Sequence, residues 1–254
     1  MAERLSTNIE GSVASITLKN PPVNVIDLAM MDELASALAQ IESQSEIAIL
    51  VFRAEGKSFS AGVDVAAHTP EKVSSMLEKF HAVIRRLVAA SKITIAGVHG
   101  NCLGGGAELA MACDLVFTTN NAHWGFPEIQ LGCFPPVAVT ALSALVGQKR
   151  ASELILTGRI ISGSEASEIG LATRAFTAEQ LDSVLDETVQ KLCALSPAAL
   201  AVTKKAIYAW DLMHFDKGLA RAEKIYLGEL MKTEDAQEGI RAFIEKRKPM
   251  WKGR

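Results

Sequence analysis

The chain has 254 residues, 49% of them hydrophobic and 22% charged, and a formal net charge of −3 at pH 7. This length suffices for one large domain, or for a domain with an appendage, and the composition is that of an ordinary globular protein. The small negative charge gives no electrostatic reason to expect nucleic acid or an anionic membrane as a partner. We find no signal-peptide core near the first residues and no apolar segment of membrane-spanning length, so we expect a cytoplasmic protein.

The first half of the chain alternates between segments typical of strands and segments typical of helices. This order favours parallel strands joined by crossover helices, and the segment 47–52 is apolar enough for a strand covered on both faces. The expected elements are a strand at 13–18, a helix at 28–41, strands at 47–52 and 93–98 with a helix at 71–90 between them, a helix that begins at the glycines 104–106, and a strand at 115–118.

From residue 138 onward the pattern is almost entirely helical. Ser196 and Pro197 have the residue types preferred at an N-cap and at the first position of a helix. We therefore divide the chain into a core at residues 1–195 and a helical region at 196–254. The helical region is amphipathic, and we expect it to serve oligomerisation and to cover the site that the core contains.

The glycine-rich segment LGGGAE at 103–108 is the most informative motif. Three glycines fit poorly inside a helix but suit the turn before one, where the backbone can approach a ligand closely. The first N–H groups of the following helix lack a partner within it and can stabilise negative charge. Glu108 adds a carboxylate in the same turn, and an acid–base side chain beside anion-binding amides favours activation of a carbonyl compound as an enolate. The motif therefore indicates an enzyme.

Two further segments are candidates for the same site. The sequence FSAGVD at 59–64 is a turn of small residues after a strand, and Asp64 is placed like a residue near the start of a helix. The sequence WGFPEIQLG at 124–132 carries a second carboxylate, Glu128, between a proline and a glycine that restrict the backbone. Taken alone, Glu108 would complement a helix dipole and Glu128 would be a solvated loop residue; together they predict an acid–base pair.

The segments AGVD, GNCLGGGAELAMACD and PEIQLG, in this order and at these spacings, resemble the enoyl-CoA hydratase/isomerase superfamily, also called the crotonase superfamily. The resemblance extends from NPPVNVID at 20–27 to LTGRIISGSEASEIGLA at 156–172. It implies an α/β fold, a spiral of ββα units with a C-terminal helical trimerisation region, assembled as a homotrimer or a dimer of trimers. It also implies an acyl-CoA thioester substrate and no metal or redox cofactor, since CoA is part of the substrate.

The resemblance further implies roles for individual residues. The backbone N–H groups of Val63 and Gly105 correspond to the oxyanion hole for the thioester oxygen, and Glu108 and Glu128 correspond to the two glutamates that hold and activate water. Because crowded carboxylates raise each other's pKa, we expect one of the pair to stay protonated near neutral pH. The expected binding site for the substrate and its CoA is formed by Val63, Asp64, Val65, Ala66 and Gly105, by the loop at 22–25 with Val25, and by Pro136.

The chain departs from the family pattern directly after PEIQLG, where CFPPVAVT stands at 133–140 in place of a glycine-rich stretch. Pro136 has no N–H, and in the family the amide at this position helps to hold the reacting water, so water must be held differently here. We expect Phe134, Val137 and Val139 to make the wall of the site bulkier and more apolar. The sequence FPPVA resembles the branch of the family that hydrates cyclohexa-1,5-diene-1-carbonyl-CoA in anaerobic degradation of aromatic compounds.

Two other functions stay open at this point. A double-bond isomerase of the same family can work with one acid, which would be Glu128, whereas hydration needs two; the presence of both acids therefore favours hydration. A non-catalytic relative that binds acyl-CoA or RNA would need neither acid, and the net negative charge argues against RNA.

The other reactive side chains show no functional pattern. Ser60 lies in FSAG and not in the GxSxG motif of serine hydrolases, and His99 is expected to be packed or bonded to the backbone. The histidines and the four cysteines show no metal-ligand spacing and no CxxC pair, so we expect reduced thiols and no metal site. Arg85, Arg86 and Lys92 are expected to be solvated near a helix end.

Overall fold

A computed structural model describes residues 3–208 and 211–253 of the chain. Six strands form the main sheet in the order β1-β2-β3-β4-β6-β9, in which β1 and β2 are antiparallel and the other neighbours are parallel. A second, three-stranded sheet has the order β5-β7-β8. The strands are β1 (Leu5–Glu10), β2 (Val13–Leu18), β3 (Ile49–Ala54), β4 (Ile93–Val98), β5 (Asn101–Leu103), β6 (Leu115–Thr119), β7 (His123–Gly125), β8 (Ile161–Ser162) and β9 (Arg174–Phe176).

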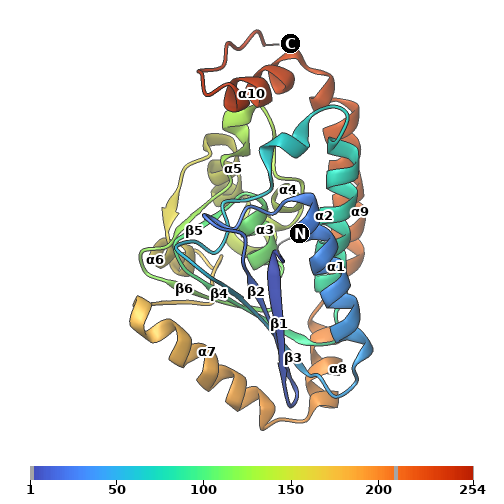
Figure 1. The fold of residues 1–254 in the computed structure, drawn as a ribbon, viewed down its shortest axis with the longest axis vertical. Helices are drawn as coiled ribbons and strands as arrows, with labels where there is room; N and C mark the ends of the chain where they lie inside the picture. Colours follow the sequence, from blue (N-terminus) through green and yellow to red (C-terminus); the bar gives the residue numbers. More distant parts are fainter. Residues whose placement is uncertain (1–2, 209–210, 254) are drawn as a thin grey trace.

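Helices join these strands and form the C-terminal part of the described chain. Figure 1 shows α1, α2 and α9 on one side of the main sheet and α7 on the other. The helices are α1 (Leu28–Ser43), α2 (Val73–Ala89), α3 (Gly105–Met111), α4 (Pro136–Val146), α5 (Gln148–Thr157), α6 (Gly163–Glu168), α7 (Ala178–Cys193), α8 (Pro197–Tyr208), α9 (Asp211–Gly228) and α10 (Glu234–Ile244), with 3₁₀ turns at Val65–His68, Pro127–Leu131 and Leu230–Lys232.

Strand β3 shows why the central strands are continuously apolar. Successive side chains of a strand point to opposite faces, so Ile49 and Val51 pack against α7 while Leu50 and Phe52 join the larger core on the other side. All four side chains are essentially buried. This arrangement confirms the prediction that the apolar segment 47–52 forms a strand covered on both faces.

The long elements agree with their predicted positions to within a few residues, whereas five strands, β1, β5, β7, β8 and β9, are absent from the prediction. Strand β1 was missed because five of its six residues are exposed and its sequence, LSTNIE, shows no useful alternation. It forms because Gly11 turns the chain back and β1 pairs along its length with β2. Strands β8 and β9 are too short to leave a periodic pattern, and they correct the prediction of an almost entirely helical second half.

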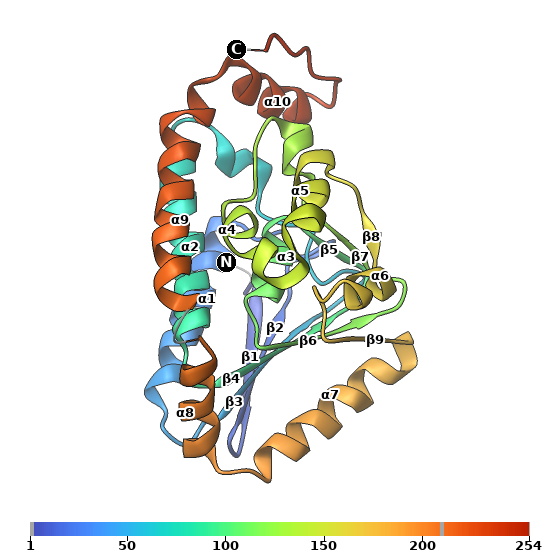
Figure 2. The ribbon, with the colours of Figure 1, turned by 180° about the vertical axis from the view of Figure 1, so that it is seen from behind.

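Helix α8 begins where the sequence indicates. The amide of Ala199 donates to Oγ of Ser196 at 3.3 Å, which is the capping contact expected at the start of α8. Helix α9 then returns beside α2, and α10 lies at the end of the molecule near the C-terminus (Figures 1 and 2). In the described part of the chain no helix has the length and apolar character that crossing a membrane requires.

Candidate active site

The two amides predicted to form an oxyanion hole belong to residues that line one cavity. Ile26 pairs with the residues on both sides of Val63: its amide donates to Gly62 at 2.9 Å and its carbonyl accepts from Asp64 at 3.1 Å. The amide of Val63 therefore points away from Ile26. Gly105 is the first residue of α3, so its amide has no acceptor within the helix. Among the described residues, neither amide has a hydrogen-bond acceptor.

Close packing around the glycine turn explains its composition. Gly104 has a φ of +50°, and a Cβ at this position would lie 2.4 Å from Oε1 of Glu128. A Cβ on Gly105 would lie 2.5 Å from Cγ2 of Val63. Only glycine leaves room for these approaches. They bring the three predicted segments together, as the sequence motifs indicated.

Glu108 is held by the start of α4. Glu108 is buried, with 3% of the residue exposed. Oε1 accepts hydrogen bonds from the amides of Val137 and Ala138 at 2.8 and 3.0 Å. Pro136 occupies the first position of this helix, where a missing N–H costs nothing, and the next two amides bind the carboxylate.

Glu128 approaches the cavity from the 3₁₀ turn Pro127–Leu131. Gly132, with a φ of +66°, ends this turn, and the amide of Cys133 donates to the Glu128 carbonyl at 3.0 Å. Oε2 of Glu128 is buried and has no hydrogen-bond partner among the described residues. The carboxyl group is therefore free to bind a molecule that enters the cavity.

The two carboxyl groups differ in their electrostatic environment. Burial raises the pKa of Glu108, but the amides of Val137 and Ala138 oppose this shift because they stabilise the carboxylate. Burial also raises the pKa of Glu128, and the negative charge of Glu108 raises it further. These surroundings favour the carboxylate form more in Glu108 than in Glu128.

The cavity has a volume of about 300 Å³, and α2 supplies much of its apolar wall through Met76, Leu77 and Phe80. It also includes Tyr226 of α9 and a phenylalanine of α10, so the helical region 196–254 contributes to the site. The predicted residues that line it are Val63, Val65, Gly105, Glu108, Glu128, Phe134 and Pro136.

Other predicted wall residues lie elsewhere. Val137 and Val139 do not line this cavity, and that part of the prediction is wrong: the amides at the start of α4 face Glu108 while these two side chains face a second cavity. Asp64 accepts a hydrogen bond from the amide of Ala66 at 3.0 Å and caps the turn Val65–His68. Asp64, Ala66 and Val25 are not part of the enclosed wall, and their contacts with CoA stay a prediction.

Two polar residues of the site were missed by the sequence analysis. His81 is completely buried in α2; its Nδ1 lies 2.7 Å from Oε1 of Glu223 in α9, and Nε2 has no partner in the described structure. Tyr226 is 1% exposed and its hydroxyl also lacks a described hydrogen-bond partner. The one signal for His81 was a histidine on the apolar face of an amphipathic helix. Tyr226 lies on α9, far from the motifs in sequence, and no local pattern identifies it.

Residues outside the motifs have mainly structural roles. The Ser60 hydroxyl donates to the carbonyl of Asn24 at 2.7 Å and accepts from the amide of Gly62 at 3.1 Å. Because it binds the backbone and not a general base, it is not arranged as a nucleophile. Nε2 of His99 lies 3.0 Å from the Gly56 carbonyl, as expected for a backbone-bonded histidine. The prediction of a solvated Lys92 is wrong, because it is 6% exposed and donates to the carbonyl at the C-terminal end of α1 at 2.8 Å.

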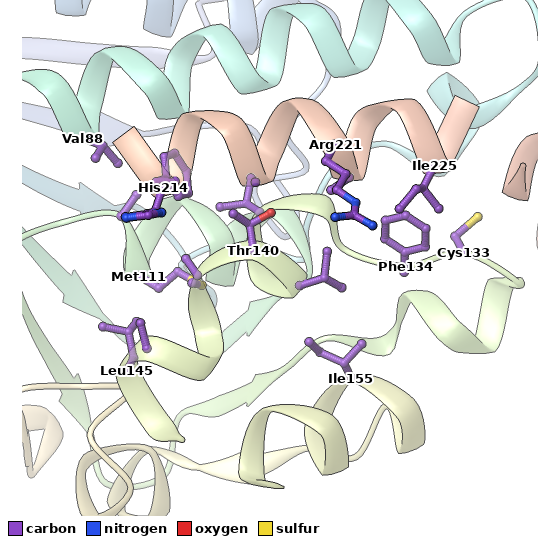
Figure 3. A pocket seen from close by; sticks show the side chains of 18 of the residues that line it. Val88, Met111, Cys133, Phe134, Thr140, Leu145, Ile155, His214, Arg221 and Ile225 are labelled. Carbon is purple, nitrogen blue, oxygen red and sulfur yellow. The ribbon is translucent and has the colours of Figure 1, made fainter. Parts of the chain in front are cut away.

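Figure 3 shows the second cavity, of about 830 Å³, between α9 and the helices α4 and α5. Its lining is mostly apolar, and Cys133 and Phe134 separate it from the smaller cavity because they line both. Several of its side chains are exposed to solvent, among them Leu145 at 44% and Leu156 at 69%. The larger cavity thus opens on an exposed apolar surface formed around α4 and α5.

The smaller cavity combines two amides without acceptors and two buried carboxyl groups of different acidity. Such a set can polarise a carbonyl oxygen and move protons at the neighbouring carbon atoms. Fold and site together indicate an enzyme.

Comparison with known proteins identifies the family of this chain. Residues 8–254 match the family described as Enoyl-CoA hydratase/isomerase. A probable enoyl-CoA hydratase of Bacillus subtilis (strain 168) is 36% identical over 257 residues, with 98% of each chain covered. The cyclohexa-1,5-dienecarbonyl-CoA hydratase of Thauera aromatica is 33% identical over 245 residues, covering 96% of this chain and 95% of that one. The crystal structure of an enoyl-CoA hydratase from Mycobacterium avium subsp. paratuberculosis K-10 aligns with a TM-score of 0.89 at 26% identity, over 99% of this chain and all of that one (100%).

The chain belongs to the enoyl-CoA hydratase/isomerase family. This confirms the resemblance, the crotonase-like α/β fold and the prediction of an enzyme of the hydratase type.

Proposed function

We propose that the protein adds water to an α,β-unsaturated acyl-CoA thioester, or catalyses the reverse dehydration. The observation that carries this proposal is that Glu108 and Glu128 line the same cavity as Val63 and Gly105, whose amides have no described acceptor. An isomerase moves one proton between two carbon atoms and can use one acid, whereas hydration needs a base for water and an acid for carbon. Two carboxyl groups at one site therefore favour hydration.

In the proposed reaction, the thioester oxygen accepts hydrogen bonds from the amides of Val63 and Gly105. Glu108 takes one proton from water while the water oxygen bonds to Cβ, and the electron pair of the double bond moves toward the thioester oxygen as an enolate. Glu128 then gives its proton to Cα, and a proton passing between the two glutamates restores the starting state. Each amide is worth about 3–4 kcal/mol of transition-state stabilisation in sites of this type.

The roles of the two acids follow from their surroundings. Glu108 accepts two backbone hydrogen bonds that favour its carboxylate form, so it is the base. Glu128 has no such donors on Oε2, and burial together with the charge of Glu108 favours its protonated form. It is therefore the acid.

Conservative replacement of the acids tests this mechanism. We expect Glu108→Gln and Glu128→Gln each to lower kcat for hydration by at least about 100-fold, because each removes one proton-transfer group. The exposed Glu168 of α6 provides a matched control, and Glu168→Gln should keep wild-type activity. Near-full hydration by either active-site variant, with an unchanged circular dichroism spectrum, would contradict the mechanism. Isomerisation that persists in Glu108→Ala would instead support the isomerase.

As the substrate within this class, we propose a cyclic dienoyl-CoA thioester. Three observations support it: the segment FPPVA at 134–138, the similarity to the Thauera aromatica enzyme named above, and a compact cavity of about 300 Å³ walled by Met76, Leu77, Phe80 and Phe134. The test compares crotonyl-CoA with cyclohexa-1,5-diene-1-carbonyl-CoA by loss of the conjugated thioester absorbance. Faster turnover of the diene supports the ring-specific enzyme, and faster turnover of crotonyl-CoA supports a general short-chain hydratase.

We also propose a cytoplasmic homotrimer or dimer of trimers. The exposed apolar face around the larger cavity supports self-association, because apolar patches of this kind mark interfaces. The four cysteines are free, as suits a reducing compartment.

A further inference from the structure

The start of α4 cannot hold the reacting water. Pro136, its first residue, has no N–H. The next two amides, of Val137 and Ala138, both donate to Oε1 of Glu108. The first three residues of α4 therefore offer no free amide to a water molecule between Glu108 and Glu128, and a donor that replaces such an amide must come from a different element.

Tyr226 supplies a hydroxyl at this place. It lines the same cavity as both glutamates, is 1% exposed, and has no hydrogen-bond partner among the described residues. The hydroxyl interacts with the thiol of Cys133, which is only a weak acceptor and itself donates to the Leu131 carbonyl at 3.6 Å. Burial raises the pKa of Tyr226, and the neighbouring Cys133, Glu128 and Glu108 raise it further, so the hydroxyl keeps its proton.

Packing fixes the position of this hydroxyl. The ring of Tyr226 meets the ring of Phe134 edge-on, with centroids 5.1 Å apart and planes at 74°. Glu223, three residues earlier and so on the same side of α9, lies 2.7 Å from Nδ1 of His81 and 2.9 Å from Arg85. Both partners belong to α2, which runs beside α9 (Figure 2). The ring contact and the ion pairs together hold Tyr226 toward the cavity.

We propose that the Tyr226 hydroxyl holds the water that adds to the substrate, in the place of the backbone amide that Pro136 lacks. This inference rests on the proposed hydratase function. One lone pair of the water oxygen accepts the hydrogen bond from Tyr226, and the other forms the bond to Cβ. One water proton passes to Glu108, and the tyrosine keeps its own proton throughout.

The test separates water addition from enolate formation. Wild-type protein, Tyr226→Phe and the control Tyr208→Phe are compared in two assays: steady-state hydration of the better of the two unsaturated thioesters, and exchange of the α-proton of butyryl-CoA in D₂O. Exchange needs the oxyanion hole and an acid–base group but no bound nucleophilic water. We expect Tyr226→Phe to lose at least about 10-fold in kcat for hydration with KM within twofold, while its exchange rate and melting temperature stay at the wild-type values. Tyr208, the only other tyrosine of the chain, lines the larger cavity, and Tyr208→Phe should keep the wild-type rates in both assays.

The outcomes distinguish this inference from the function on which it rests. Unchanged hydration by Tyr226→Phe, in an active wild-type background, would overturn the inference alone. A parallel loss of hydration and exchange, or a lower melting temperature, would show that Tyr226 has a structural role and would also overturn it. Wild-type protein that exchanges the α-proton but adds no water would overturn the hydratase function and the inference with it.

Discussion

Gly104 lies directly before α3, the helix that carries Glu108, and its Cα faces the carboxyl group of Glu128. It has a φ of +50°, and a Cβ there would lie 2.4 Å from Oε1 of that acid. Gly11, in the turn between β1 and β2, also has a positive φ, of +58°, but a Cβ there would meet no atom within 4 Å. Both glycines therefore have a backbone conformation that is unfavourable for other residues. They differ because a side chain would displace Glu128 at Gly104 and would displace nothing at Gly11.

We expect Gly104→Ala to lower kcat by about 100-fold, because it moves Glu128 out of the geometry for proton transfer. Both Gly104→Ala and Gly11→Ala should lose stability, by about 1–2 kcal/mol from the backbone alone. Gly11→Ala should keep wild-type activity. Steady-state kinetics combined with thermal unfolding of both variants checks this, and equal activities would show that displacement of Glu128 is not the cause.

Glu128 is half-buried, with its Oε2 buried, and we expect its titration to make stability depend on pH. Burial and the charge of Glu108 raise its pKa from 4.5 to about 8, so the folded state binds a proton that the unfolded chain releases above pH 4.5. Stability is therefore full below about pH 4.5 with respect to this group and falls as the pH rises toward 8. We expect the melting temperature of Glu128→Gln to fall less than that of the wild type between pH 5 and pH 8. The same slope in both proteins, measured by calorimetry, would show that Glu128 is not the titrating group.

At the scale of elements, α7 covers one face of the main sheet mainly through Leu181 and Leu185. Leu185 is 1% exposed and packs so closely on β4 that a Cβ added to Gly97 would lie 2.5 Å from its Cδ1. Residues of α7 do not line the active-site cavity. This helix therefore serves the stability of the sheet and not the chemistry.

We expect Leu185→Ala to lower the free energy of unfolding by about 2–5 kcal/mol, because it leaves a cavity against the sheet. Its kcat should stay at the wild-type value at a temperature where the variant is folded. Leu195 lies just beyond the same helix and is 54% exposed, so Leu195→Ala should change stability by less than about 0.5 kcal/mol. Urea denaturation measures both variants, and a small effect of Leu185→Ala would contradict the packing argument.

In the whole molecule, the C-terminal helices α9 and α10 complete the wall of the cavity that the motifs of the core form. Tyr226 of α9 and Phe243 of α10 line the active-site cavity, although the motifs lie between residues 59 and 132. The outer side of the same arrangement leaves the apolar face of the larger cavity exposed (Figure 3). One helix, α9, thus contributes to both surfaces.

We expect light scattering after size exclusion to give a mass that is three or six times the 27.2 kDa of one chain. Leu156→Asp, which places a charge on the apolar face where the side chain is 69% exposed, should reduce this mass. Leu195→Asp, outside that cavity, should not. A monomeric wild type would overturn the proposed assembly, and an unchanged mass for Leu156→Asp would exclude this face as its interface.

Features that depend on local backbone and local chemistry could be predicted from the sequence. A glycine turn before a helix, a carboxylate one turn later and a proline-bounded second carboxylate leave a record in neighbouring residues, and so do the continuously apolar strands and the long amphipathic helices. Strand β1 left none, because its exposed residues obtain their structure from pairing with β2.

The side chains that line the cavity between these motifs could not be predicted, because long-range packing places them there. His81 and Tyr226 reach it because α9 packs beside α2, and Val137 and Val139 leave it because α4 turns its amides, and not these side chains, toward Glu108. Such contacts join residues far apart in the chain, and the free energy that selects them comes from packing and burial across the whole core. No short stretch of sequence contains that information.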